Sequence, residues 1–235
     1  MIVSAPSCFH EADPNVPLSR RAAAEGLGTT LLVFAASAAG LAASRLLPGQ
    51  PGAAVVLVAV AVAGALAALI IALGKLSGGH YNPLISVLRL LAGERSVQCT
   101  IAYVGAQLAG GIAGGRLAAA LWNVPPSSAG GMGPAGMISE LVASAGLMLV
   151  VFGSSRSGRP ESGPFAVAAW LVAAVIATPT GSYANPAVVI GAMVTAGPIA
   201  LGGRSALAYA IAEIAGALIA ISVITALFPA GRVTR

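Results

Sequence analysis

The chain has 235 residues, of which 57% are hydrophobic and 8% are charged, and its mean hydropathy is +0.92. A soluble domain carries about a quarter charged residues, so this composition argues against soluble folding and predicts a membrane protein. The net charge of +5 could suggest nucleic-acid binding, but the twelve cationic residues are scattered between apolar segments and form no basic face. Nucleic acid is therefore not an expected partner.

The first 19 residues form a polar tail. They contain Glu11, Asp13 and three prolines and lack an apolar core, so we predict a solvated tail and no signal peptide. Of the two cysteines, Cys8 lies in this tail and Cys99 lies at the start of an apolar segment. Their spacing suits neither a metal site nor a disulfide framework, so no metal ion or other cofactor is expected.

The rest of the chain is divided into apolar segments of two lengths. Crossing a hydrocarbon core of about 30 Å takes about 20 helical residues. Six stretches are suitable, at 22–46, 53–74, 97–121, 136–155, 163–179 and 204–228. Two further apolar pieces, 83–92 and 186–195, have only ten residues, and ten helical residues rise about 15 Å, half of a membrane. The predicted fold class is an all-α membrane protein with six transmembrane helices and two re-entrant half-helices.

The charges in the connections predict the orientation of these helices. If both termini lie in the cytoplasm, that side holds nine cationic residues and the other side holds three, in agreement with the positive-inside rule. The nine are Arg20, Arg21, Lys75, Arg89, Arg95, Arg156, Arg159, Arg232 and Arg235, and the three are Arg45, Arg116 and Arg204. Both termini are therefore expected in the cytoplasm.

The two short pieces reveal an internal repeat. Residues 77–84 read SGGHYNPL and residues 180–187 read TGSYANPA, and the two asparagines are 185 − 82 = 103 residues apart. Because each half has three crossings, the second half must sit inverted relative to the first. Broken helices in inverted repeats place a site near the bilayer midplane. The predicted domains are a tail at 1–19, a channel domain at 20–228 with halves at about 20–122 and 136–228, and a tail at 229–235.

An Asn-Pro pair begins each short piece, as a side-chain cap followed by the residue that is tolerated in a first helical turn. Non-helical backbone at membrane depth survives only where it is buried in protein or lines a wet cavity. Two half-helices that enter from opposite sides can meet at their N-termini, where the asparagines also offer amide donors to a solute. The positive ends of both helices disfavour a cation there. The predicted midplane residues are Asn82, Pro83, Leu84, Asn185, Pro186 and Ala187.

At these motifs the sequence resembles the aquaporin and glycerol-facilitator family, the major intrinsic proteins. The two motifs are similar to the two re-entrant loops of the family, and Glu25 and Glu140 match the glutamates of its first and fourth helices. The segment 102–111, AYVGAQLAGG, resembles its third helix. The resemblance covers about residues 20–228. It implies a homotetramer of independent pores in a lipid bilayer, here a bacterial inner membrane, that passes water or small neutral solutes passively.

Three residues depart from the family pattern. Leu84 stands where the family has alanine, and it is expected to add bulk beside the midplane. Glu213 stands where relatives tend to have an apolar residue or proline. Val188 stands directly after the second Asn-Pro-Ala, where the family usually places arginine.

The resemblance also locates a selectivity filter. In the family, four residues form the outer constriction, and counting from the two asparagines, with no gap assumed, places them here at Val62, Ala173, Ser182 and Val188. This set has no aromatic, histidine or arginine side chain, so we predict a wide and mostly apolar aperture with Ser182 as a polar contact. The loss of arginine removes both a donor fork and a fixed positive charge.

Such an aperture suits glycerol-like polyols, urea or neutral metalloid hydroxides such as arsenous acid, together with water. A small oxyanion or organic acid is an alternative permeant, but an apolar ring makes the dehydration of an anion costly. A strict water channel is another alternative, if neighbouring side chains refill the space.

Ionisable residues inside the membrane are candidates for function. For Glu25 and Glu140 we expect a supporting role, in which they accept hydrogen bonds from N–H groups of the re-entrant loops. Two interpretations of Glu213 are open, pairing with Gln107 across the pseudo-two-fold axis or lining the pore. His80 is expected along the cytoplasmic half of the pore, as a loop anchor or a pH gate.

The predicted function is a passive transmembrane channel for small neutral solutes. An enzyme is not expected, because the sequence has no metal-ligand cluster, nucleophile–base set or phosphate loop. A proton-coupled secondary transporter is an alternative, since inverted repeats also build transporters; its candidate proton carriers are Glu25, Glu140, Glu213 and His80. A non-transporting scaffold is a further alternative if Leu84 plugs the pore.

Overall fold

The computed structural model describes residues 15–127, 131, 133–157 and 160–228. Within these ranges every regular element is a helix. In chain order they are α1 (Leu18–Leu46), α2 (Pro51–Ser77), α3 (Pro83–Leu91), α4 (Val97–Leu121), α5 (Gly133–Arg156), a 3₁₀ turn (Pro160–Ser162), α6 (Gly163–Ala177), α7 (Pro186–Ala192) and α8 (Gly203–Leu227). Most of the predicted N-terminal tail, with Cys8, and the C-terminal tail 229–235 lie outside the described residues.

The six predicted crossings correspond to six of these helices. By length and composition, α1, α2, α5 and α8 are able to span a membrane. Helix α4 has 25 residues but carries Gln107 and several glycines, and α6 is apolar but has 15 residues. Helix α6 ends at Ala177, two residues before the predicted end, because Thr178 takes an extended backbone conformation (φ −103°, ψ 137°).

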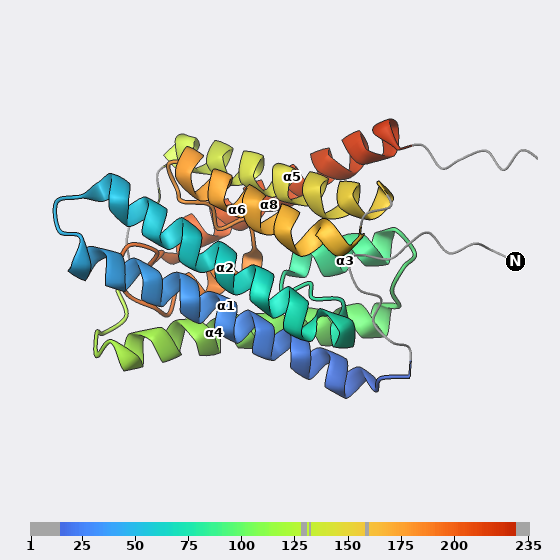
Figure 1. The fold of residues 1–235 in the computed structure, drawn as a ribbon, viewed down its shortest axis with the longest axis horizontal. Helices are drawn as coiled ribbons and strands as arrows, with labels where there is room; N and C mark the ends of the chain where they lie inside the picture. The colour runs from blue at the N-terminus through green and yellow to red at the C-terminus, as the bar shows by residue number, and fades with distance from the viewer. Residues whose placement is uncertain (1–14, 128–130, 132, 158–159, 229–235) are drawn as a thin grey trace, which may run out of the picture.

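The two halves of the sequence pack in equivalent ways. Helix α1 packs on α2 and α4 in the first half, as α5 packs on α6 and α8 in the second, and α2 against α6 joins the halves. Figure 1 shows α1, α2 and α4 running side by side along the long axis of the molecule. The main hydrophobic core lies between α2, α5 and α6 and extends to α3.

The two half-helices begin as the Asn-Pro pairs predict. The side-chain oxygen of Asn82 accepts from the N–H of Leu84 at 2.9 Å, and that of Asn185 accepts from the N–H of Ala187 at 3.0 Å. Helix α7 is shorter than the predicted 186–195. It ends at Ala192 because the next residues form tighter turns with bonds to carbonyls three residues back.

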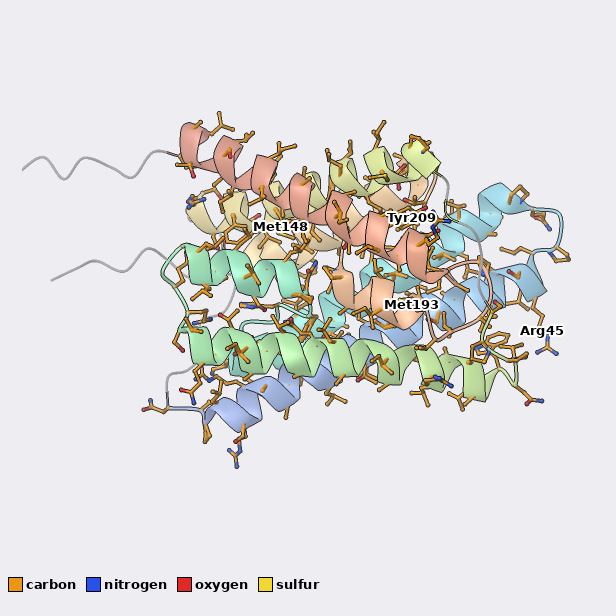
Figure 2. The ribbon with its side chains drawn as sticks, turned by 180° about the vertical axis from the view of Figure 1, so that it is seen from behind. Arg45, Met148, Met193 and Tyr209 are labelled. Carbon is orange, nitrogen blue, oxygen red and sulfur yellow. The ribbon has the colours of Figure 1, made fainter. Side chains whose placement is uncertain are left out.

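Helix α7 packs against the opposite half of the repeat. It lies on α4 of the first half, where Gly111 and Gly115 face its backbone. A Cβ atom at either position would collide with the carbonyl oxygen of Ala187 or Gly191. Figure 2 labels Met193, directly after the end of α7, beside α4. This close approach places the start of α7 deep inside the molecule.

Candidate solute pathway

Glu25 of α1 holds the first re-entrant loop. Its carboxylate accepts from the N–H groups of His80 (3.0 Å) and Tyr81 (2.6 Å) and from the hydroxyl of Ser77 (2.6 Å). Gln107 of α4 donates its amide N–H to the same carboxylate at 2.8 Å. Glu25 is fully buried. The four bonds supply a partner for backbone that forms no helix, which is the supporting role expected from the sequence.

Two carboxyl groups hold the second loop. Glu140 of α5 accepts from the N–H of Tyr183 (3.2 Å) and of Ala184 (2.8 Å). The next N–H along the chain, that of Asn185, donates to Glu213 of α8 at 2.8 Å. Both glutamates are fully buried. Three consecutive peptide groups are thus fixed by acidic side chains from two helices.

The position of Glu213 matches neither of the two interpretations made from the sequence. It does not bond to Gln107, and it is not among the residues that line the cavity described below. Each of these two side chains instead supports the loop of its own half, Gln107 through Glu25 and Glu213 through Asn185. The reason is geometric, because Gln107 lies beside Glu25, which binds the first loop, whereas Glu213 lies beside the N–H of Asn185 in the second loop.

The two asparagines bind across the repeat. Asn82 donates its side-chain N–H to the carbonyl of Ala184 at 2.9 Å, and Asn185 donates to the carbonyl of Tyr81 at 2.8 Å. Tyr81 and Ala184 both have φ of 45°, a left-handed conformation that is uncommon for residues other than glycine. Each asparagine NH₂ group has two hydrogens. One is used in the crossing bond, and the other is free to meet a solute.

A cavity of about 660 Å³ runs past these asparagines. Its lining includes Gly40 and Ala54, near the α1–α2 end of the bundle, and also Ile85 of α3 and Val167 of α6. One side is an aliphatic wall, made by Val62, Leu66, Ile70, Leu147, Val151, Val167, Leu171 and Val175. The other side is the two re-entrant loops, with Gly79, His80, Asn82, Thr180, Gly181, Ser182, Tyr183, Ala184 and Asn185. The cavity is therefore apolar on one side and polar on the other.

Three of the four predicted filter residues line this cavity. Val62 and Val188 are each 9% exposed, and the buried hydroxyl oxygen of Ser182 has no hydrogen-bond partner among the described residues. Ala173 is placed elsewhere, because it is exposed on the outside of the chain and does not line the cavity. Helix α6 turns Leu171 and Val175 towards the cavity instead. At about 100° per residue, Ala173 lies about 200° around the helix from either of them.

The bulk of Leu84 does not reach the cavity. Leu84 is 7% exposed and packs in the hydrophobic core, while Asn82 and Ile85 are the residues of this turn that face the cavity. Of the other predicted midplane residues, the two prolines and Ala187 form the first turns of the half-helices and do not line the cavity. A plug formed by Leu84 is therefore not what the structure shows.

His80 faces the cavity and is anchored at the same time. Its Nδ1 lies 2.9 Å from the hydroxyl oxygen of Ser86, and its ring meets the ring of Tyr103 edge-on at 5.4 Å. Its Nε2 has no hydrogen-bond partner among the described residues. The anchoring role expected from the sequence is present in these contacts.

Arg89 has a role that the sequence analysis missed. It is 1% exposed, it pairs with Glu94, and its guanidinium lies over the ring of Phe152 at 4.8 Å and bonds to Ser155 at 3.3 Å. These contacts tie α3 to α5 of the opposite half. An arginine inside a ten-residue apolar piece is a signal for a buried pair as well as for topology.

In the part of the chain that the structure describes, no three His, Cys, Asp or Glu side chains are placed to hold a metal ion. The chemistry available to a solute consists of amide and hydroxyl groups, backbone carbonyls, the imidazole of His80 and aliphatic side chains.

Comparison with known proteins agrees with this architecture. The family model described as "Major intrinsic protein" matches residues 14–181. "Aquaglyceroporin AqpS" of Rhizobium meliloti (strain 1021) is 36% identical over 208 residues, which cover 87% of this chain and 88% of that protein. "Lens fiber major intrinsic protein" of Gallus gallus is 37% identical over 153 residues, which cover 59% of this chain and 55% of that protein.

The fold is also found among solved structures. The aquaglyceroporin from Plasmodium falciparum superposes with a TM-score of 0.70 at 19% identity, over 88% of this chain and 96% of that chain. The family match makes the protein an integral membrane channel for water and small solutes, and the solved structure agrees with it in fold. The chain belongs to the major intrinsic protein family.

Proposed function

We propose that this protein is a passive channel for small neutral solutes, with a wide aperture that lacks arginine. One observation carries the proposal. Val188, directly after the second Asn-Pro-Ala, faces the cavity where the family usually places a cationic side chain. A valine there leaves neither a fixed charge nor a donor fork at the aperture.

The two sides of the cavity support a choice of solute class. A polyol, urea or a neutral metalloid hydroxide such as arsenous acid can bond to amides, carbonyls and Ser182 on the loop side. Its less polar side then contacts the aliphatic wall, which includes Val62 and Leu171. An anion would lose its hydration against that wall without gaining a cationic partner. Neutral solutes are therefore favoured over oxyanions and organic acids.

The buried acids support passive transport over proton coupling. Glu25, Glu140 and Glu213 each bind backbone N–H groups of a re-entrant loop. A carboxyl group that cycled its proton during transport would have to release those bonds. In this proposal the acids hold the pathway in shape and do not carry protons across it.

Stopped-flow light scattering on vesicles that contain the full-length protein tests the proposal. We expect glycerol and urea gradients to relax at least tenfold faster than in empty vesicles, and Val188→Arg to remove most of the glycerol flux while water flux persists. Rapid water flux without glycerol flux would indicate a strict water channel. Uphill uptake driven by a pH gradient would indicate a coupled transporter, and unchanged permeability would indicate a scaffold.

We further propose a homotetramer in a bacterial inner membrane, with both termini in the cytoplasm. The family resemblance supports the tetramer, the Rhizobium relative supports a bacterial membrane, and the charge distribution supports the orientation. Arg45 lies in the last turn of α1, at the end of the bundle away from α3 (Figure 2). In a protein without native cysteines, Arg45→Cys should react with an impermeant maleimide added outside intact cells. Reaction only after lysis would reverse the orientation, and native mass spectrometry measures the subunit number.

A further inference from the structure

Helices α4 and α8 carry the same local sequence at equivalent places. Residues 102–111 read AYVGAQLAGG and residues 208–217 read AYAIAEIAGA, so Gln107 of the first half corresponds to Glu213 of the second. Both side chains are fully buried beside the re-entrant loop of their own half. The two loops are therefore supported by equivalent residues of different chemistry, an amide and an acid.

The amide acts as a donor. Gln107 donates its side-chain N–H to the Glu25 carboxylate at 2.8 Å and to the hydroxyl of Ser86 at 3.0 Å. This amide is the fourth donor to the Glu25 carboxylate, beside two backbone N–H groups and the hydroxyl of Ser77. In the first half, one acid and one amide thus form a bonded pair.

An ionised Glu213 cannot donate a hydrogen bond, so the second half would lack the donor that Gln107 supplies in the first half. Glu213 accepts from the N–H of Asn185 with Oε1, but Oε2 is buried and has no hydrogen-bond partner among the described residues. Glu140 already uses both oxygens, Oε1 for Tyr183 and Oε2 for Ala184. The two acids bind consecutive peptide groups, so their carboxyl groups lie close together.

Among the described residues, no cation offsets two negative charges at this place. The helices packed against α8 are α5, α7 and α3. Helix α5 contributes Glu140 itself and Arg156, which is exposed in its last turn, and α8 has Arg204, which is exposed in its first turn. Helix α7 has no titratable side chain, and Arg89 of α3 is engaged by Glu94 and Phe152. The remaining titratable groups nearby are Tyr183 and Tyr209, whose rings pack at 5.6 Å. Two ionised carboxylates side by side in a buried place repel each other, and adding one proton removes that repulsion.

We propose that Glu213 carries a proton in the folded channel and acts as a positioning residue for the second re-entrant loop, donating through Oε2 to Glu140 as Gln107 donates to Glu25. The proton fills the unbonded position and makes the acid an equivalent of glutamine. The shared arrangement of the two halves is then complete, with one ionised carboxylate and one donor on each loop. The inference goes beyond the proposed function and does not depend on which solute passes.

Infrared spectroscopy of the purified full-length protein tests this proposal without any transport measurement. A protonated carboxylic acid has a C=O stretching band that an ionised carboxylate lacks. At neutral pH we expect this band in the wild type and in Glu161→Gln, a control at an exposed acid, and its loss in Glu213→Gln. The reverse exchange, Gln107→Glu, should add a second band. A band that persists in Glu213→Gln, or a folded Gln107→Glu without a new band, would overturn the proposal.

The pH dependence of thermal stability gives a second test. A Glu213 that is ionised in both the folded and the unfolded state would leave this dependence unchanged at neutral pH. If the folded state binds one proton more than the unfolded state, stability falls as pH rises, by about tenfold in the folding equilibrium constant per pH unit. Wild type and Glu161→Gln should therefore show a steeper fall in melting temperature across neutral pH than Glu213→Gln. Parallel curves for all three proteins would contradict a protonated Glu213.

Discussion

The two sides of the cavity are built on different principles. The loop side is made of backbone and short polar side chains, held in an uncommon conformation by buried acids and by two asparagine bonds that cross between the halves. The wall side is made of aliphatic side chains on ordinary helices, and its shape depends only on their volume. Removing a buried acid on the loop side should therefore prevent folding, whereas enlarging a side chain on the wall side should chiefly narrow the aperture.

The largest effect is expected on the loop side, for Glu25→Ala. The change leaves four buried donors without an acceptor. Each costs about 1–3 kcal/mol, against a total stability of about 5–15 kcal/mol. We expect no folded protein after purification, as measured by monodispersity in size-exclusion chromatography. The matched control is Glu161→Ala on an exposed acid, which should behave as wild type. A folded and active Glu25→Ala would show that the loop supports itself.

A smaller effect on folding but a large one on flux is expected on the wall side, for Val175→Phe. The ring fills part of the cavity next to Leu171, and a barrier raised by about 1.4 kcal/mol lowers the rate tenfold. We expect glycerol permeability per folded molecule to fall by about tenfold, and the melting temperature to fall less than in Glu25→Ala, because overpacking a buried core position costs about 1–3 kcal/mol. Ala173→Phe is the matched control, since Ala173 does not line the cavity. If the Ala173 variant blocks glycerol and the Val175 variant does not, Ala173 is the filter residue on α6, as counting from Asn185 predicts.

Leu84→Ala should separate stability from permeability. Leu84 is buried in the core and does not line the cavity. Removing such a side chain costs about 2–5 kcal/mol, so the melting temperature should fall. Water and glycerol permeability per folded molecule should stay within about twofold of wild type. A large rise in permeability would mean that this leucine does obstruct the pathway.

The smallest effect is expected for Ser182→Ala. Its hydroxyl has no partner among the described residues and faces the aperture, so its loss removes one solute contact and leaves no protein group unpaired. A hydrogen bond is worth about 0.5–1.5 kcal/mol, and we expect glycerol permeability to fall about threefold. Thr178→Ala is the control, because that hydroxyl bonds to the carbonyl of Ala174. An unchanged glycerol flux would leave backbone carbonyls as the polar contacts of the aperture.

The sequence was informative where a local motif determines local structure. The Asn-Pro pairs predicted both half-helix starts, because a cap and a first-turn proline act within a few residues. The family resemblance was confirmed by the family match. Glu25 and Glu140 were expected to bind loop N–H groups, and both do.

The sequence was less informative where the role of a residue depends on the rotation of a helix about its axis or on a contact partner that is distant in the chain. Counting back from Asn185 predicts Ala173, but a count does not give the face of α6 that turns to the cavity, where Leu171 and Val175 lie. The partner of Glu213 could not be predicted, since it depends on which helix stands beside the second loop. Arg89 appeared as a topology signal because its partner Phe152 comes from the other half.

The crossing asparagine bonds have a consequence for biosynthesis. The amide of Asn82 bonds to a carbonyl that lies 102 residues further along the chain. At a synthesis rate of about 5–20 residues per second, that partner is made about 5–20 s after Asn82. During this delay the first half has its loop and half-helix without the acceptor that completes them. The nascent first half must therefore stay in the membrane without this hydrogen bond until the second half is made. A chain that is truncated before residue 184 never provides the acceptor, so its first re-entrant loop cannot reach the native structure.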